Sequence, residues 1–258
     1  MLKLSNKNNI KVISIESLSQ YVEELENRND QDYLIFRGQK DDKPLLPKIA
    51  RKFDIRKDYL TRGNGIQELE KELINDFKKQ SVNLYKVKPT NEWEWLSLAQ
   101  HHGLRTRLLD WTENPLAALW FAIKEPIDEG QYAVVWVLEY DKKDQVGADE
   151  LEKTPYRIKK TRIYFPNHIT TRITAQNAVF TVHGYINTND KSHFLTLERN
   201  STHKKKLTKF TIPADKAGDI RYNLDRCGNN YSSLFADLDG LCKHLNWDSA
   251  EVLDEKNK

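Results

Sequence analysis

The chain has 258 residues, 38% of them hydrophobic and 31% charged, with a formal net charge of +3. This length suits one large domain or two small ones, and the charge is too mild to indicate nucleic-acid binding by itself. The two cysteines form no CxxC pair, which argues against a zinc ribbon or redox dithiol and favours a reducing, cytoplasmic compartment. No run approaches the roughly 18 apolar residues of a spanning helix, so we expect a soluble protein that makes no membrane contact.

The first half of the chain is predicted to be mainly helical, because apolar residues recur at every third or fourth position. The predicted helices are residues 18–26, a stretch after Gly65 that ends near residues 86–89, and two helices within residues 95–123. Gly103 separates these last two, and the second begins at Pro115, which suits the first helical turn. One buried strand, residues 33–36, interrupts the helices, because Tyr-Leu-Ile-Phe is a continuous β-type apolar run.

The second half is predicted to be rich in strands separated by turn-forming residues. These strands are residues 132–140, 161–165, 178–183, 193–197 and 207–212. Two helices follow, one from residue 214 or 215 toward Leu224 and one over residues 232–245 with a leucine stripe. The early strand needs partners for its backbone groups, and the later strands can supply them. We therefore predict one α+β domain in which a helical N-terminal half packs on a mixed or antiparallel sheet.

Arg37 and Gly38 directly follow the early strand, so they lie at an end of the predicted sheet. A guanidinium in that place can point into a cleft and hold a phosphate or carboxylate through two parallel hydrogen bonds. Gly38 lets a ligand or another backbone come close. The alternative is a structural arginine that pairs with an internal acid such as Asp110.

The apolar stretch 95–123 contains a cluster of polar residues, namely Thr106, Arg107, Asp110 and Thr112. Arg107 and Asp110 are three positions apart and can pair if they lie on a helix or turn. Thr112 or Asn114 can cap the helix that begins at Pro115, whose N-terminus can also receive an anion. The alternative is a buried polar network that fixes one packing arrangement.

Further candidates are a histidine pair and two polar residues before a predicted strand. His101 and His102 are adjacent at a helix end, so they cannot both face one metal ion, and we expect no metal site. One of them, His101, is a candidate base or hydrogen-bonding group, unless it is a satisfied buried histidine. Arg172 and Gln176 can face the same cleft as Arg37, or they are ordinary polar residues before a strand.

Two motifs carry a resemblance to a known family. Phe36-Arg37-Gly38 and the segment LAQHHGLRTRLLDWTENPLAALWFA at residues 98–122 resemble the FRG domain, which is named for its Phe-Arg-Gly motif. Residues 172–180 and 233–241 also resemble it, whereas Arg105 replaces the family's usual proline. The resemblance implies an FRG domain over residues 31–246, after an N-terminal helix in residues 1–30 and before a loose charged tail at 247–258.

The order of motifs is also loosely similar to that of arginine-class ADP-ribosyltransferases, which implies NAD as the cofactor. In that similarity Arg37 holds the NAD phosphate or ribose, and Gln176 stands where the enzymes have a glutamate. A neutral amide does not stabilise an oxocarbenium-like state as a carboxylate does, so the chain either binds a nucleotide without turnover or uses another acid such as Asp110.

These resemblances give a prediction of NAD or nucleotide binding, in an ADP-ribosyltransferase-like protein of bacterial anti-phage defence or a toxin system. The predicted catalytic residues are Arg37, His101 and Gln176, and the predicted cofactor-binding residues are Arg37, Gly38, Thr106, Arg107, Asp110, Thr112 and Arg172. One alternative is a non-catalytic module that recognises a nucleotide, a nucleic acid or a phage protein. Another is a purely structural polar cluster, with the function on the remaining surface.

Overall fold

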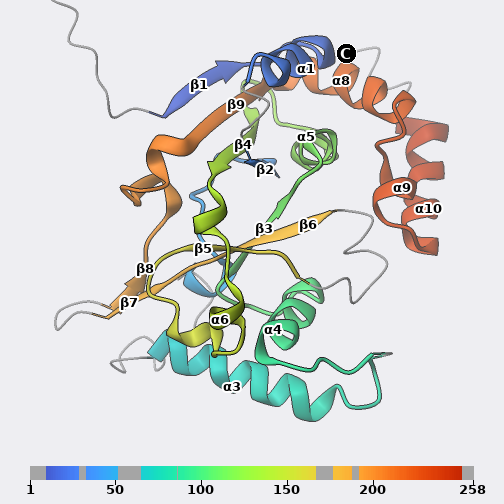
Figure 1. The fold of residues 1–258 in the computed structure, drawn as a ribbon. Coiled ribbons are helices and arrows are strands. Elements are labelled where there is room, and N and C mark those ends of the chain that lie inside the picture. The colour runs from blue at the N-terminus through green and yellow to red at the C-terminus, as the bar shows by residue number, and fades with distance from the viewer. Residues whose placement is uncertain are drawn as a thin grey trace, which may run out of the picture.

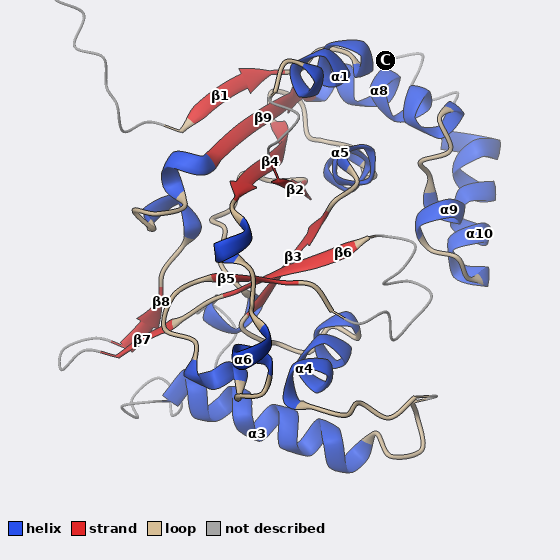
Figure 2. Cartoon of the chain, in the orientation of Figure 1, coloured by secondary structure: helices blue, strands red, loops and turns tan. Residues whose placement is uncertain are grey.

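A seven-stranded mixed sheet, with strand order β1-β9-β4-β2-β3-β6-β5, forms the centre of the computed structural model. The structure describes residues 10–28, 33–51, 65–85, 87–166, 177–187 and 192–251. Helices α1, α5 and α8 lie along one part of the sheet, and α3 and α4 lie beside β3, β5 and β6 (Figure 1; Figure 2). The predicted single-domain α+β fold is confirmed.

The strands of this sheet are β1 (Lys11–Ser14), β2 (Tyr33–Gln39), β3 (Leu108–Thr112), β4 (Tyr132–Tyr140), β5 (Arg162–Tyr164), β6 (Ala178–Val182) and β9 (Leu207–Pro213). Among the described strands, β1 and β9 are the parallel neighbours, and the other pairs are antiparallel. A separate antiparallel pair consists of β7 (Tyr185–Asn187) and β8 (Ser192–Phe194). The early strand does pair with a later one, because β2 runs antiparallel to β4 over its whole length.

Strand β4 is buried on both faces, which explains why its sequence is almost continuously apolar rather than alternating. Its neighbours β2 and β9 cover both of its edges. The alternating side chains enter two different core clusters, Ala133, Val135 and Val137 on one face and Val134, Trp136 and Leu138 on the other.

The α-helices are α1 (Leu18–Glu26), α3 (Gly65–Gln80), α4 (Glu92–His101), α5 (Pro115–Ile123), α6 (Ala148–Leu151), α8 (Ala214–Arg226), α9 (Tyr231–Leu234) and α10 (Leu238–Asn246). Short 3-10 turns are η1 (Lys48–Ala50), η3 (Lys142–Asp144), η4 (Pro155–Arg157), η5 (Leu197–Arg199) and η6 (Lys204–Lys206), and a π-helical turn, η7, spans Trp247–Glu251. The expected tail from residue 247 therefore begins inside a helical turn, where Trp247 is buried. No helix within the described ranges is long and apolar enough to cross a membrane.

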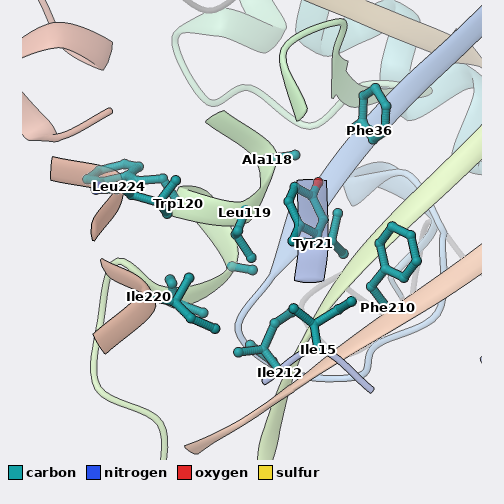
Figure 3. Close-up of a cluster of buried hydrophobic side chains, with 14 of the residues drawn as sticks. Ile15, Tyr21, Phe36, Ala118, Leu119, Trp120, Phe210, Ile212, Ile220 and Leu224 are labelled. Carbon is teal, nitrogen blue, oxygen red and sulfur yellow. The ribbon is translucent and has the colours of Figure 1, made fainter. Parts of the chain in front are cut away.

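Helix α5 is the most apolar helix of the fold and lies against the sheet beneath α1 and α8. Asn114 caps it, because its side chain accepts hydrogen bonds from the main-chain N–H groups of Leu116 and Ala117 at 3.0 and 3.1 Å. Tyr21 of α1 lies among the buried core side chains (Figure 3). Its hydroxyl donates a hydrogen bond to the Pro115 carbonyl at 2.9 Å. The expectation that Thr112 or Asn114 caps this helix is thus met by Asn114.

Both helices predicted in residues 95–123 are present as α4 and α5, but residues 108–112 between them form strand β3 rather than a turn. This strand pairs with β6 over five residues, Leu108 to Thr112 opposite Val182 to Ala178. Apolar side chains on both of its faces enter core clusters, as suits a strand that is buried between β2 and β6. Helix α3 also ends at Gln80, earlier than expected.

The predicted last helix, residues 232–245, is two helices. The first, α9, ends at Leu234, and Asp237 caps α10 by accepting a hydrogen bond from the Gly240 N–H at 2.7 Å. The leucine stripe is largely exposed on α10, with Leu238 at 78%, Leu241 at 41% and Leu245 at 56%. The strand expected at residues 193–197 is shorter, because η5 begins at Leu197.

Candidate functional site

A cleft opens where strands β2 and β3 separate. Among the described residues, the two strands pair at a single position, Phe36 with Thr112, whereas β2 continues beside β4 to Gln39. The space between the diverging strands is a cleft of about 540 Å³. This volume lies within the range of about 300–1,000 Å³ that is usual for small-molecule sites.

The cleft combines apolar, cationic and hydrogen-bonding walls. The lining residues are the aromatic Phe36, Trp111, Phe121 and Phe180, the cations Arg37, Lys40 and Lys124, the acids Asp110 and Glu125, and the polar Gln39, Gln100, His101 and Thr112, together with Gly38, Ala118 and Ala178. Lys124 is paired with Glu125 at 3.3 Å. Apolar walls with a few convergent polar groups are typical of ligand sites.

Arg37 spans the gap between the two strands at the base of this cleft. Its Nη1 donates a hydrogen bond to the Asp110 main-chain carbonyl at 2.7 Å and lies 3.7 Å from the Asp110 carboxylate. Its Nε is buried and has no hydrogen-bond partner among the described residues. Burial lowers the pKa of the Arg37 guanidinium, and the nearby Asp110 opposes this shift. Arg37 therefore lines the cleft and also contacts Asp110, whereas its predicted role in holding a phosphate or carboxylate stays a prediction.

Asp110 is held in a fixed orientation by a chain of hydrogen bonds. Thr106 Oγ1 accepts a hydrogen bond from the Leu108 N–H at 3.1 Å, so its own proton is directed to Gln100 Oε1 at 2.7 Å. This fixes the Gln100 amide, whose Nε2 faces the two Asp110 carboxylate oxygens at 3.1 and 3.0 Å. The Asp110 side chain is still 55% exposed. Thr106 is fully buried and acts behind the cleft wall rather than in it.

Gln100 lines the cleft but was not predicted as a site residue from the sequence. It lies on the last turn of α4, directly before His101, and its contact with Asp110 crosses from that helix to β3. The one signal in the sequence is its place next to two candidate residues, at the end of an amphipathic helix. Lys40 and Lys124 also line the cleft without having been predicted.

Arg107 lies away from the cleft, and its predicted pairing with Asp110 is wrong. Both Arg107 and Glu70 are completely buried, and the Arg107 Nε donates to Glu70 at 2.8 Å while its main-chain N–H donates at 2.5 Å. The guanidinium also lies over the Tyr156 ring, 4.8 Å from its centroid. Arg107 therefore attaches the start of β3 to α3. It does not pair with Asp110, because residues three positions apart on an extended chain face opposite sides.

Gly38 makes room for a helix. A Cβ atom built there would lie 1.9 Å from the Ala118 carbonyl oxygen and 2.6 Å from the Ala122 nitrogen, both in the backbone of α5. Of the two expected uses of Gly38, the close approach of another backbone is the one observed. Thr112 lines the cleft and accepts a hydrogen bond from the Asn114 N–H at 3.0 Å.

The two histidines differ as expected, because His101 is partly buried and lines the cleft whereas His102 is exposed. Arg172 and Gln176 lie outside the described residues. Within the described part of the chain, no three histidine, cysteine or acidic side chains gather closely enough to hold a metal ion.

A buried histidine supports the Trp111 wall from behind. The Trp111 indole N–H donates to Thr181 Oγ1 at 3.0 Å, so the Thr181 proton is directed to His183 Nε2 at 3.1 Å. The other ring nitrogen, Nδ1, then carries the proton and faces the Leu195 carbonyl at 3.3 Å. Burial lowers the pKa of His183 to about 3, so the ring is neutral at physiological pH.

Comparison with known families identifies part of the chain. Residues 32–131 match the family model of the FRG domain. This part of the chain is thus similar to the FRG domain. The match includes β2, α3, α4, β3 and α5, and so every cleft residue except Ala178 and Phe180. Beyond residue 131, the FRG domain expected over residues 31–246 stays a prediction.

No curated protein and no solved structure matches the chain. These comparisons therefore do not support the looser similarity to ADP-ribosyltransferases.

Proposed function

We propose that the cleft of the FRG domain binds NAD or a related nucleotide. The observation that carries this proposal is an incompletely hydrogen-bonded guanidinium beside an oriented carboxylate in a cleft of about 540 Å³. Arginine holds phosphate through charge-assisted hydrogen bonds, and a carboxylate accepts hydrogen bonds from ribose hydroxyls. A nucleotide presents both groups, together with a flat base that suits aromatic walls.

In this proposal Arg37 holds a phosphate with the N–H groups that the Asp110 carbonyl does not use. Asp110 accepts hydrogen bonds from the ribose hydroxyls on the oxygen lone pairs that Gln100 leaves free. Lys40 lies at the end of β2 and adds positive charge, whereas Lys124 is partly neutralised by Glu125. Gln176 and Arg172 remain proposed contacts to ribose and phosphate.

If the cleft also catalyses ADP-ribosyl transfer, the bond between nicotinamide and the ribose breaks and positive charge develops on the sugar. A nearby carboxylate is then needed to stabilise that charge. Asp110 lines the cleft and is the proposed acid, because Gln176 is neutral. His101 also lines the cleft and is the proposed hydrogen-bonding group or base.

Binding is tested by calorimetry with NAD, ADP and AMP, and turnover by nicotinamide release. Arg37→Gln removes the phosphate contact, which is a charge-assisted hydrogen bond of about 1.5–3 kcal/mol, so affinity should fall roughly 10- to 100-fold. Arg162→Gln is the matched control, because Arg162 also contacts one carboxylate (Glu150, 3.1 Å) and one main-chain carbonyl (Lys143, 2.6 Å), outside the cleft.

The two variants separate binding from stability. An unchanged affinity in Arg37→Gln, with a melting temperature lowered as much as in Arg162→Gln, would make Arg37 purely structural and end the proposal. Loss of affinity in Arg37→Gln alone supports it.

A non-catalytic recognition module is the second candidate function. It is favoured by the environment of Asp110, whose charge is already opposed by Arg37 and Gln100 and is therefore less able to stabilise a cationic transition state. Nucleotide binding without nicotinamide release, at any substrate concentration, supports this module over the transferase. The same module could present the bound nucleotide to a protein or nucleic-acid target.

A role in anti-phage defence or a toxin system, in the cytoplasm, belongs to the same proposal. It rests on the FRG domain and on Cys227 and Cys242, which are both exposed and unpaired, as is usual in a reducing compartment. Phage plating on cells that express the wild type or Arg37→Gln tests it. Equal plaque numbers on both strains and on cells without the protein would count against a defence role.

A further inference from the structure

A second concave surface lies between helix α3 and the η4 turn, and it shares no lining residue with the cleft. We call it the α3 groove and define it by Lys71 and Lys78 of α3, Tyr156 and Arg157 of η4, and Glu92 at the start of α4. Its volume is about 350 Å³. The groove thus holds three cations against one carboxylate.

The charges of α3 are segregated around the helix. The side of α3 that lines the groove presents Gln67, Lys71, Asn75 and Lys78, which contain cations and amides without an acid. The acids Glu68, Glu72 and Asp76 recur every four residues on the neighbouring face. A helix that is merely solvated usually alternates charges within one face so that they pair.

The groove cations are not neutralised by neighbouring carboxylates. Within the described part of the chain, neither Lys71, Lys78 nor Arg157 forms an ion pair, whereas Lys79, outside the groove, pairs with Asp76 at 3.9 Å. Lys71 lies over the Tyr156 ring and Lys78 over the Trp95 ring, 5.5 and 5.9 Å from the ring centroids. Their positive charge therefore remains available to a ligand.

The groove has a rigid floor. The Tyr156 ring lies between Lys71 and the buried Arg107, whose guanidinium carbon is 4.8 Å from the ring centroid. Glu70, which faces inward from the same helix, holds Arg107 by its side chain and its main chain. This buried ion pair fixes the distance between α3 and η4, so the groove is formed before a ligand arrives.

We propose that the α3 groove binds a nucleic-acid strand through its phosphates. Lys71 and Lys78 are seven residues apart on one helix, which separates them by about 10 Å along the axis, a span of a few phosphates. Arg157 adds a planar donor on the opposite wall, and Gln67, Asn75 and Thr154 supply hydrogen-bonding groups.

The test is fluorescence anisotropy with short fluorescein-labelled single strands of DNA and RNA at increasing salt. Lys71→Gln with Arg157→Gln should weaken binding at least tenfold at low salt. The slope of log affinity against log salt should become shallower by about 1.4, because each phosphate that the protein no longer neutralises reduces it by about 0.7. Lys79→Gln, the same change on the same helix outside the groove, should bind like the wild type.

Glu92→Gln should instead raise the affinity for the single strand, because it removes the one carboxylate that lines the α3 groove. Arg37→Gln should bind the strand normally, so failure of the nucleotide proposal leaves this one testable. No binding by the wild type at low salt, or an equal loss in Lys79→Gln, would overturn the proposal. Binding of poly-glutamate with the same dependence on Lys71 and Arg157 would also overturn it, since it would make the groove a site for acidic peptides.

Discussion

Replacing Gly38 by alanine should strongly destabilise the protein. The added Cβ would lie 1.9 Å from the Ala118 carbonyl oxygen, and real Cβ contacts are essentially never below 3.0 Å. Moving from 1.9 to 3.0 Å requires a shift of about 1.1 Å between β2 and α5, and the second contact at 2.6 Å to Ala122 blocks a simple sideways escape. Both obstacles are backbone atoms, so no side chain can rotate away.

We expect a loss of about 3 kcal/mol or more, at the upper end of the range for overpacked cores. For a protein of this size that corresponds to a fall in melting temperature of roughly 6–12 °C. The assay is urea and thermal unfolding followed by circular dichroism. Gly147→Ala is the control, because its φ is −82° and nothing lies within 4 Å of a Cβ there, so it should cost only a few tenths of a kcal/mol.

The same experiment distinguishes the two roles proposed for Gly38, which are close packing against α5 and close approach of a ligand. A Gly38→Ala protein as stable as Gly147→Ala, with nucleotide affinity lost, would refute the packing explanation and show that the glycine serves ligand approach.

Three further predictions concern polar side chains. Glu70→Gln leaves the Arg107 guanidinium buried without a counter-ion, so the free energy of unfolding, measured with urea and tryptophan fluorescence, should fall by about 3–5 kcal/mol. The double variant Glu70→Leu with Arg107→Met should restore most of this loss, and a loss below about 1 kcal/mol in Glu70→Gln contradicts the prediction. The pKa of His183 is lowered from 6.5 to about 3, so the unfolded chain takes up a proton that the folded chain resists. His183 should therefore lower stability by about 1.4 kcal/mol per pH unit as the pH falls from 6.5 toward 3, and in His183→Gln urea midpoints across that window should lose this dependence. Gln100→Leu removes the amide that orients Asp110, and NAD affinity by calorimetry should fall about tenfold whereas Gln131→Leu, on an exposed turn, leaves it unchanged.

Local sequence patterns correctly predicted the elements whose structure does not depend on distant residues. Helix α1, with its Ser17 cap, and strand β4 have the predicted bounds, because periodicity and a long apolar run depend only on nearby residues. The same is true of Asn114 before Pro115, where cap and first helical position are adjacent in the sequence.

The errors arose where contacts between distant residues decide the structure. Leu108 to Thr112 is a strand because β6, about 70 residues later, supplies its ladder, and no local signal reveals that partner. Arg107 seemed a site residue from its place beside Asp110, but Glu70, which binds it, precedes it by 37 positions. Gln100 reaches Asp110 only because α4 ends beside β3.

The single pairing between Phe36 and Thr112 divides the backbone hydrogen bonding of the sheet into two nearly separate ladders, β1-β9-β4-β2 and β3-β6-β5. Amide hydrogens in the two ladders can therefore exchange with solvent through separate openings, each with its own free energy. A ligand that contacts Arg37 on one ladder and Asp110 on the other would join them. Its binding should slow exchange in β3 and β6 together with β2, which gives a measure of occupancy that needs no turnover.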